Sequence, residues 1–515
     1  MACAASPAAT AAPAPLGLGM MIASSLVLAA ANFLVVLDTT IANVSAPNIA
    51  GALGASPEQG TWVITSYAVA EAVTVPLTGW LAARFGPIRI FVAGMFGFGV
   101  CSFLCGLAPV LGVLVLLRFL QGLCGGPLIP LTQTLLLRVF PKNLKTAATG
   151  IWAITTLIAP IIGPILGGVL CDDIGWSYIF WINVPVAIAT AGLAWNLLRT
   201  FETAPSRARI DVVGLGLLIF WVTCLQVMLD TGKDRDWFAS PFTIALAVGA
   251  SVGFGFFVIW ELTDRNPVVD LRVFRHRGYT AAVATVVLGY GAVFGINVLT
   301  PLWLQQNMGY TATWAGLVSA QLGVSAVAIA PLAAILAPRI DVRRLAFIGL
   351  AWMGAVTVLR AQMTSQASLF AISQGLLLQG LGLPFFFVPL TGFALACVDA
   401  RETTSAAGLM SFCRTMAGAL ATSIITTAWD NDANRDHSEL AGVLGGAQDT
   451  IDRLKALGFG AEPARAYVDR MVQQQSIMLA ANALFMAAAG AFVLASLAIW
   501  LAPRPKRAMQ GGGAH

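Results

Sequence analysis

Fourteen long apolar segments constrain this chain more than any other feature of its sequence. A helix that crosses a bilayer needs about 20 predominantly apolar residues. Only 10% of the 515 residues are charged, against roughly 25% in an ordinary soluble domain. Because backbone groups in lipid must pair internally, we expect helices, and so an all-α polytopic membrane protein. The expected spans are 18–42, 60–82, 88–107, 110–132, 147–170, 177–198, 210–229, 240–261, 279–303, 312–336, 344–363, 368–394, 405–428 and 476–501.

The basic residues support an even number of spans. If the N-terminus is cytoplasmic, the inner loops and tail hold nineteen Lys and Arg residues. The short outer loops then hold only three, Lys233, Arg235 and Arg360. This asymmetry is the positive-inside pattern of membrane proteins. We therefore expect a multi-pass membrane protein with both termini in the cytoplasm.

An internal repeat divides the spans into two halves. Leu81–Phe85 resembles Leu336–Ile340, 255 residues later, and Gln121–Leu123 recurs as Gln379–Leu381, 258 residues later. The matches relate spans 1–6 to spans 9–14, so spans 7 and 8 are an insertion. Both copies begin on the same side of the membrane. Parallel halves that rock about a midplane site are an alternating-access architecture.

These patterns give five expected parts. They are a disordered N-terminal tail (1–17), an N-terminal six-helix bundle (18–199), a linker with two extra transmembrane helices (200–277), a C-terminal six-helix bundle (278–501) and a C-terminal tail (502–515). The second bundle includes a long acidic outer loop, 429–475. Its helical spacing predicts a hairpin that caps the outer face or meets a partner, because loops of this length are usually functional or disordered.

Span 5 is unusually rich in proline and glycine. In a membrane, neighbouring helices, hydroxyl groups and waters can satisfy the backbone groups that proline frees. Small residues four apart let another helix backbone approach closely. We expect a bent helix with one closely packed side, although ordinary packing in a membrane bundle explains the pattern equally well. The residues of this motif are Pro160, Gly163, Pro164, Gly167 and Gly168.

Four ionisable residues lie well inside apolar spans: Asp38, Glu71, Arg118 and Arg414. A charge at the bilayer centre costs at least about 2.5 to 3.5 kcal/mol, so each needs a partner, a cavity or neutralisation. Asp38 and Arg118 lie at similar depth in the same half. Because arginine stays protonated in proteins, Asp38 is the only member of this pair that can carry a proton. The hypothesis is that Asp38 binds and releases a proton whose affinity Arg118 sets; the alternative is a static ion pair that fixes packing.

Several sequence motifs together resemble the fourteen-helix drug:proton antiporters of the major facilitator superfamily, EmrB/QacA type. The motifs are Leu37–Val44, Gly79–Gly86, Arg118–Gly122, Gly163–Gly168 and Trp181–Pro185. The resemblance covers nearly the whole chain. It implies the major facilitator fold and proton-driven export of hydrophobic or amphipathic toxic compounds such as uncouplers, antibiotics or detergents. It also implies two partners, an EmrA-like periplasmic membrane-fusion adaptor and a TolC-like outer-membrane channel. In this family the span 5 motif is associated with export.

The resemblance also assigns a motif to the cytoplasmic loop after span 2, at Gly79, Arg84, Gly86 and Arg89. The family usually has an acid where this chain has Ala83. That departure weakens a carboxylate–arginine latch in this loop, and positive-inside anchoring explains the two arginines equally well.

The superfamily places the second helix of one half opposite the fifth helix of the other. Glu71 and Arg414 are therefore expected to meet across the central cavity in a state-dependent pair. Alternatively, Glu71 is a second proton site or a contact for cationic drugs. Residues on the expected walls of that cavity are mostly apolar, with isolated amides, as suits amphipathic organic molecules. The candidates are Asn32, Gln121, Trp152, Gln379, Phe386 and Met410.

No cofactor or metal site is expected. The chain has no GxxxxGK[ST] phosphate-binding loop, its eight cysteines have no metal-ligand spacing, and its three histidines lie in loops and the tail. No catalytic constellation appears, so an enzyme is not expected, and neither is a nucleic-acid partner. Two alternatives remain: a proton-coupled symporter for a small organic nutrient, and a membrane structural or receptor protein without transport.

Overall fold

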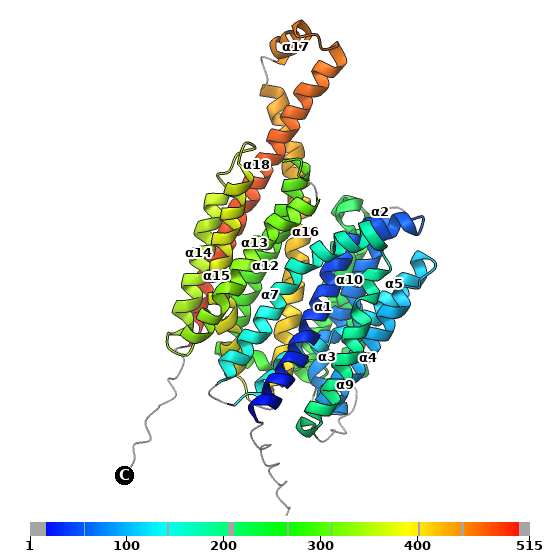
Figure 1. The fold of residues 1–515 in the computed structure, drawn as a ribbon, viewed down its shortest axis with the longest axis vertical. Coiled ribbons are helices and arrows are strands. Elements are labelled where there is room, and N and C mark those ends of the chain that lie inside the picture. Colours follow the sequence, from blue (N-terminus) through cyan, green and yellow to red (C-terminus); the bar gives the residue numbers. More distant parts are fainter. Residues whose placement is uncertain are drawn as a thin grey trace, which may run out of the picture.

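The computed structural model describes residues 17–503, apart from 56, 142–143, 204–210, 265–266, 311, 400–401 and 444–446. The predicted tails therefore lie almost wholly outside the described residues. The described chain is helical throughout and contains no strand, which confirms the predicted all-α class (Figure 1). The helices are α1 Leu18–Ala52, α2 Pro57–Gly60, α3 Trp62–Phe85, α4 Pro87–Cys105, α5 Leu111–Gly125, α6 Leu128–Val139, α7 Lys145–Val169, α8 Tyr178–Trp181, α9 Asn183–Leu198, α10 Val212–Thr231, α11 Pro241–Thr263, α12 Arg277–Gln306, α13 Ala312–Leu336, α14 Val342–Arg360, α15 Leu369–Ala396, α16 Thr403–Val443, α17 Ala447–Ala456 and α18 Ala461–Ala498.

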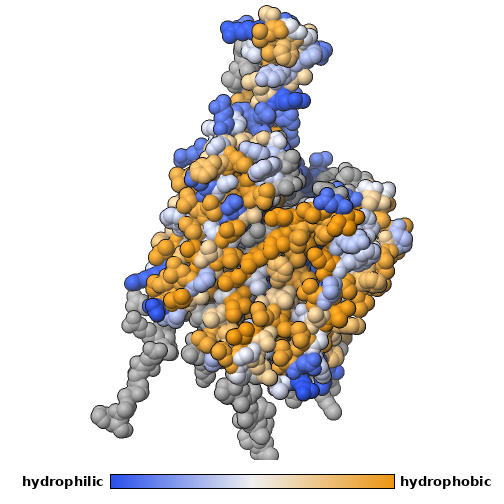
Figure 2. Space-filling view, viewed as in Figure 1, coloured by the Kyte–Doolittle hydropathy of each residue, from blue (hydrophilic) through white to orange (hydrophobic). Residues whose placement is uncertain are grey.

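Each predicted span coincides with helical structure. Thirteen segments of the described chain are long and apolar enough to cross a membrane. The remaining predicted span is α3, whose Ser, Thr and Tyr residues and Glu71 lower its hydropathy. Most of α3 is buried between other helices, so it has little need of a lipid-facing surface. Apolar side chains cover much of the bundle surface seen in Figure 2, as a lipid-exposed surface requires.

The helices pack as two groups with an inserted pair. In the first group α1 packs on α7 and α9, and α3 on α5; in the second α13 packs on α15, and α14 and α12 on α18. The inserted helices α10 and α11 pack on each other, and α10 also contacts α3 and α16. The two groups meet where α7 contacts α13 and where α3 contacts α16.

Small residues bring α3 and α16 together. A Cβ on Gly79 would collide with Ser405, and one on Gly408 would lie 2.9 Å from the carbonyl oxygen of Val75. These contacts join the C-terminal half of α3 to the beginning of α16. The side of the bundle where α1 begins and α18 ends is here called the terminus side (Figure 1). The opposite side, which carries residues 429–475, is called the extension side.

The extension (residues 429–475) differs in part from its prediction. A helical hairpin was expected as a separate element between two spans. Instead, α16 continues without interruption from its span to Val443, and α18 starts at Ala461 and continues into the last span. Apart from Pro463 in the first turn of α18, no proline interrupts these helices, so nothing stops them at the membrane edge. They project well beyond the bundle, with α17 at the tip (Figures 1 and 2).

The glycines of the proline-rich helix α7 pack against α1. A Cβ on Gly163 would lie 2.7 Å from Thr40 Cβ and would also collide with the Thr40 hydroxyl. A Cβ on Gly167 would lie 3.2 Å from the carbonyl oxygen of Ile41. The close approach expected of this face is therefore present, and its partner is the helix that carries Asp38. The helix is continuous to Val169 and then widens into a π-helical turn.

Gly163→Ala is expected to lower the free energy of unfolding by about 1–3 kcal/mol, because the added methyl group overpacks the contact with Thr40. Gly168→Ala is the matched control, since a Cβ there meets nothing within 4 Å. Thermal unfolding of the detergent-purified variants measures the difference. Equal melting temperatures for the two variants would contradict the close α1–α7 contact.

Candidate functional site

A buried ion pair lies at the centre of the first helix group. Arg118 Nη1 on α5 is 2.6 Å from Asp38 Oδ2 on α1. The two side chains are each about 1% exposed. The structure thus brings together the two residues that the sequence placed at similar depth. A buried charge pair is stable only if its remaining hydrogen-bonding groups are also satisfied.

Neighbouring amides and a backbone carbonyl supply those hydrogen bonds. Asn183 Nδ2 on α9 donates to Asp38 Oδ1 at 2.7 Å, and Gln121 Nε2 donates to the same oxygen at 3.2 Å. Arg118 donates to Gln121 Oε1 at 2.8 Å and to the carbonyl oxygen of Val63 at 3.2 Å. One carboxylate therefore holds α1, α5 and α9 together. Gln121, which is also expected on a cavity wall, is part of this cluster.

Two further residues complete the cluster, and sequence reasoning gave neither a role. The guanidinium of Arg118 lies 4.3 Å from the ring centre of Tyr67, a cation–π contact. Asn183 lies within the Trp181–Pro185 motif. The signal that could have found it was a lone amide between apolar residues at the start of α9.

The second helix group contains a matching cluster without an acid. Arg360 at the end of α14 is only 2% exposed, which corrects its assignment to an outer loop. It donates to Gln379 Oε1 and, at 2.8 Å, to the hydroxyl of Thr300 on α12. Its guanidinium lies 4.6 Å from the ring centre of Phe485. Gln379 is the repeat partner of Gln121. Thr300, on the first helix of its half, accepts from Arg360 as Asp38 accepts from Arg118. No described carboxylate pairs with Arg360.

Glu71 and Arg414 face each other across the contact of α3 with α16 without forming an ion pair. They are 8% and 6% exposed and interact electrostatically, but among the described residues no ion pair joins them within 4.0 Å. The guanidinium of Arg414 lies instead beside three rings, 5.2 Å from Trp152, 5.4 Å from Tyr290 and 5.9 Å from Phe387. Arg414 is thus held by an aromatic cage, and the pairing hypothesis stays a prediction.

The remaining candidate cavity residues are buried between helices. Trp152 on α7 stacks on Phe387 of α15 with 5.8 Å between ring centres, a contact between the two halves. Phe386 and Met410 are 0% and 3% exposed. Asn32 Nδ2 on α1 is 2.8 Å from each of two hydroxyl oxygens on α7, those of Thr155 and Thr156.

The loop between α3 and α4 is held by an acid from elsewhere in the chain. Gly86 has a φ of 96°, a conformation that favours glycine. Glu202, which follows α9, accepts the backbone N–H of Arg89 at 3.0 Å and would collide with any Cβ on Gly86. Its carboxylate lies at the N-terminus of α4, where a negative charge is favourable. Glu202 thus provides a carboxylate in a loop where Ala83 replaces the usual acid.

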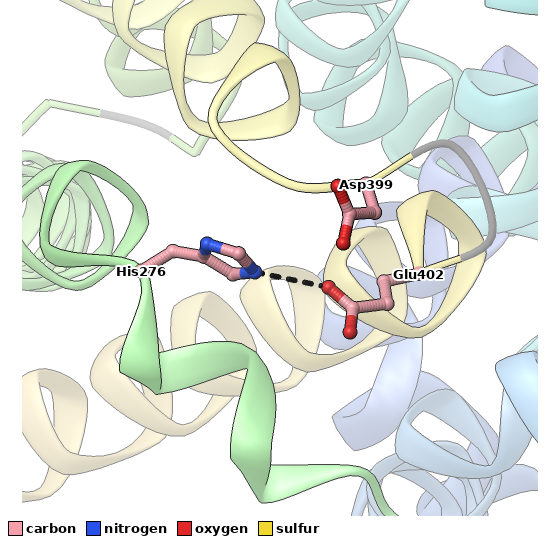
Figure 3. A group of neighbouring side chains, drawn as sticks. All are labelled: His276, Asp399 and Glu402. Carbon is pink, nitrogen blue, oxygen red and sulfur yellow. Dashed lines mark hydrogen bonds and ion pairs between the residues drawn. The ribbon is translucent and has the colours of Figure 1, made fainter.

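A second polar cluster lies on the terminus side, between the segments that precede α12 and α16. His276 Nε2 is 3.0 Å from Glu402 Oε2, and Asp399 lies nearby (Figure 3). Arg275 pairs with Glu402 at 2.6 Å and with Asp399 at 3.8 Å. The three possible ligand atoms lie within 4.8 Å of one another, but the Arg275 guanidinium already pairs with both carboxylates and disfavours a metal ion between them.

Comparison with known proteins agrees with this geometry. Residues 28–422 match the family model of the Major Facilitator Superfamily. The chain belongs to this superfamily. It is 40% identical to the Multidrug export protein EmrB of Escherichia coli K12 over 504 residues, which cover 97% of this chain and 98% of EmrB. It is 38% identical to the Fatty acid resistance protein FarB of Neisseria gonorrhoeae, over 95% of this chain and 97% of FarB.

Solved structures share the major facilitator fold. The human organic anion transporter MFSD10 superposes with a TM-score of 0.59 at 13% identity, covering 93% of this chain and 99% of MFSD10. The proton:xylose symporter XylE gives a TM-score of 0.57 at 13% identity, covering 94% and 96%. At these identities the likeness concerns the fold alone. The predicted fold and family are therefore confirmed.

Thr300→Asp is expected to raise the melting temperature by a few degrees, because it supplies the carboxylate that Arg360 lacks. Hydrogen bonds to charged groups contribute about 1.5–3 kcal/mol. Thr285→Asp is the matched control: Thr285 is also buried on α12, but its hydroxyl bonds only the carbonyl oxygen of Ala281. That control should destabilise the protein. If Thr300→Asp destabilised it as much, the equivalence of the two clusters would be contradicted.

Proposed function

We propose that this major facilitator protein is a proton-driven multidrug exporter working by alternating access. Residues 18–199 and 278–501 form the two moving halves, and residues 200–277 form the inserted linker. The observation that carries the proposal is the buried Asp38–Arg118 pair, in a chain 40% identical to a multidrug export protein over nearly its whole length. The basic residues favour a cytoplasmic location for the terminus side.

Asp38 is the proton carrier in this proposal. Protonation removes the negative charge, so the ion pair with Arg118 is lost and the amides of Asn183 and Gln121 lose an ionised acceptor. The packing of α1 against α5 and α9 then changes. Since α1 packs on α7, and α7 contacts α13 of the other half, the change reaches the contact between the halves. Arg118 keeps its charge throughout.

The proton gradient supplies enough energy for export. One charge moving down 100 mV releases about 2.3 kcal/mol, which supports a roughly fiftyfold concentration ratio. The proposed substrates are hydrophobic or amphipathic organic molecules. The support is the aromatic character of the contact between the halves, where Trp152, Phe387 and Tyr290 surround one cation, Arg414. Such apolar surroundings with few polar groups suit drug-like compounds.

The proposed partners are a periplasmic membrane-fusion adaptor and an outer-membrane channel, with this chain in the inner membrane. The extension supports an adaptor contact, because it projects from the bundle (Figure 1). Large apolar side chains on it are exposed where a second protein could cover them. They are Leu457, Phe459, Tyr467 and Met471, which are 77%, 46%, 49% and 52% exposed.

Asp38→Asn is expected to abolish substrate-driven proton movement in proteoliposomes that contain only this chain, because asparagine cannot carry a proton. Asp236→Asn is the control: Asp236 lies in the loop between α10 and α11 with a φ of 52°, a conformation that asparagine tolerates. Full proton-coupled export by Asp38→Asn would contradict the proton-carrier role and would favour a static ion pair that only fixes packing. Net uptake of substrate by the wild type would favour the symporter instead.

The double substitution Leu457→Asp with Tyr467→Asp is expected to reduce drug resistance in cells while leaving transport in proteoliposomes unchanged. The reason is that both side chains are exposed on the extension, outside the bundle that transports. Glu462→Gln, an exposed polar change on the same extension, is the control. Unchanged resistance in cells, together with normal expression, would contradict an adaptor contact at these residues.

A further inference from the structure

Two buried acids lie at the base of the inserted helix pair, and neither has a role in the mechanism above. Asp211, which precedes α10, is 9% exposed, and Glu261 near the end of α11 is 0% exposed. The carboxylate of Asp211 accepts the backbone N–H of Gly214 at 2.9 Å and the indole N–H of Trp260 at 2.9 and 3.0 Å. Glu261 Oε2 accepts the backbone N–H of Val269 at 3.2 Å.

The other oxygen of Glu261 has no partner. Glu261 Oε1 is buried and makes no hydrogen bond. It points toward the same place as an oxygen of Asp211: a Cβ on Gly214 would lie 2.6 Å from Glu261 Oε1 and would also collide with Asp211 Oδ2. The two carboxyl groups therefore converge above Gly214, in a space that only a residue without a side chain leaves open.

No described cation neutralises this pair. Among the residues that the structure describes, neither Asp211 nor Glu261 makes an ion pair. A third acid, Asp264, also interacts electrostatically with Glu261, and its backbone oxygen accepts a hydrogen bond from Arg272 at 2.6 Å. Two ionised carboxylates this close, both removed from water, repel each other strongly, and one then retains a proton.

We propose that Asp211 and Glu261 share one proton. The proton is placed on Glu261 because the Asp211 carboxylate already accepts two N–H groups, those of Gly214 and Trp260. Glu261 is the protonated partner, and its Oε1–H donates to Asp211 Oδ2, which satisfies the one carboxyl oxygen of Glu261 that otherwise has no partner. The acid pair is thus a proton-binding site separate from Asp38, on a different pair of helices.

The shared proton links the start of α10 to the end of α11, the two ends of the inserted helix pair. Asp211 leads into α10, and Glu261 holds the chain that follows α11 through Val269. Because α10 contacts both α3 and α16, the site fixes a helix that touches both halves. Loss of the proton replaces the hydrogen bond between the two carboxyl groups by repulsion. The contact between the start of α10 and the end of α11 therefore weakens as the pH on the terminus side rises.

The number of protons released on unfolding tests the proposal. The folded protein keeps a proton that a free glutamate loses above about pH 4.3, so this proton stabilises the wild type at low pH, and its contribution falls as the pH rises. Melting temperatures of the whole protein in nanodiscs, measured from pH 5 to 8, should fall with pH. The pH dependence of unfolding gives the number of protons released on unfolding. That number should be about one smaller for Glu261→Gln than for the wild type. Asp236→Asn, at the other end of the same helices, should behave as the wild type.

A spectroscopic measurement covers the case in which a variant unfolds too readily. Infrared spectra of the wild type at neutral pH should contain the carbonyl band of a buried protonated carboxyl group. The band should remain in Asp38→Asn and disappear in Glu261→Gln. Identical pH dependence and identical bands in Glu261→Gln and wild type would overturn the proposal. So would stabilisation of the wild type, but not of Glu261→Gln, by added Na⁺, Mg²⁺ or Ca²⁺, because the pair would then hold a metal ion.

Discussion

The buried pair of Asp38 and Arg118 is the interaction on which the rest of this structure depends. A charge inside a bilayer is stable only with a complete set of partners, and here Asn183 and Gln121 provide them. Three helices are thereby tied to a single carboxylate. The glycines of α7 pack directly on α1, with contacts that begin within one turn of that carboxylate, and α7 also touches the other half. A change in the charge of Asp38 therefore has a direct physical route to the contact between the halves.

The two halves are similar in layout but differ in charge. Gln121 and Gln379 are repeat partners, and each bonds a buried arginine. Among the described residues, only the first half supplies a carboxylate to its arginine, whereas the arginine of the second half, Arg360, bonds neutral groups. A group that stays charged in every state cannot carry a proton, so the second cluster can position helices but cannot couple them to a gradient. The proposed proton coupling through Asp38 therefore belongs to one half of a duplicated fold.

The sequence predicted features that depend on hydrophobicity and repetition. The spans, the repeat and the proximity of Asp38 to Arg118 follow from apolar length, matching motifs and depth. Arg360 was missed because an arginine at the end of a span usually reaches the interface. Glu261 was missed for a similar reason, since it ends an apolar run and its burial depends on the fold of residues 267–271. The aromatic cage of Arg414 required side-chain directions from α7, α12 and α15, which spacing along one helix does not provide.

Proton release on substrate binding tests the central claim most directly. The measurement uses purified protein in weakly buffered detergent solution with a pH indicator. Adding substrate should release protons from the wild type, because substrate and protons compete for binding in an exporter that exchanges one for the other. Asp38→Asn should bind the same substrate and release none. Equal proton release from the two proteins would show that Asp38 is not the carrier, and the account of coupling built on its pair with Arg118 would be wrong.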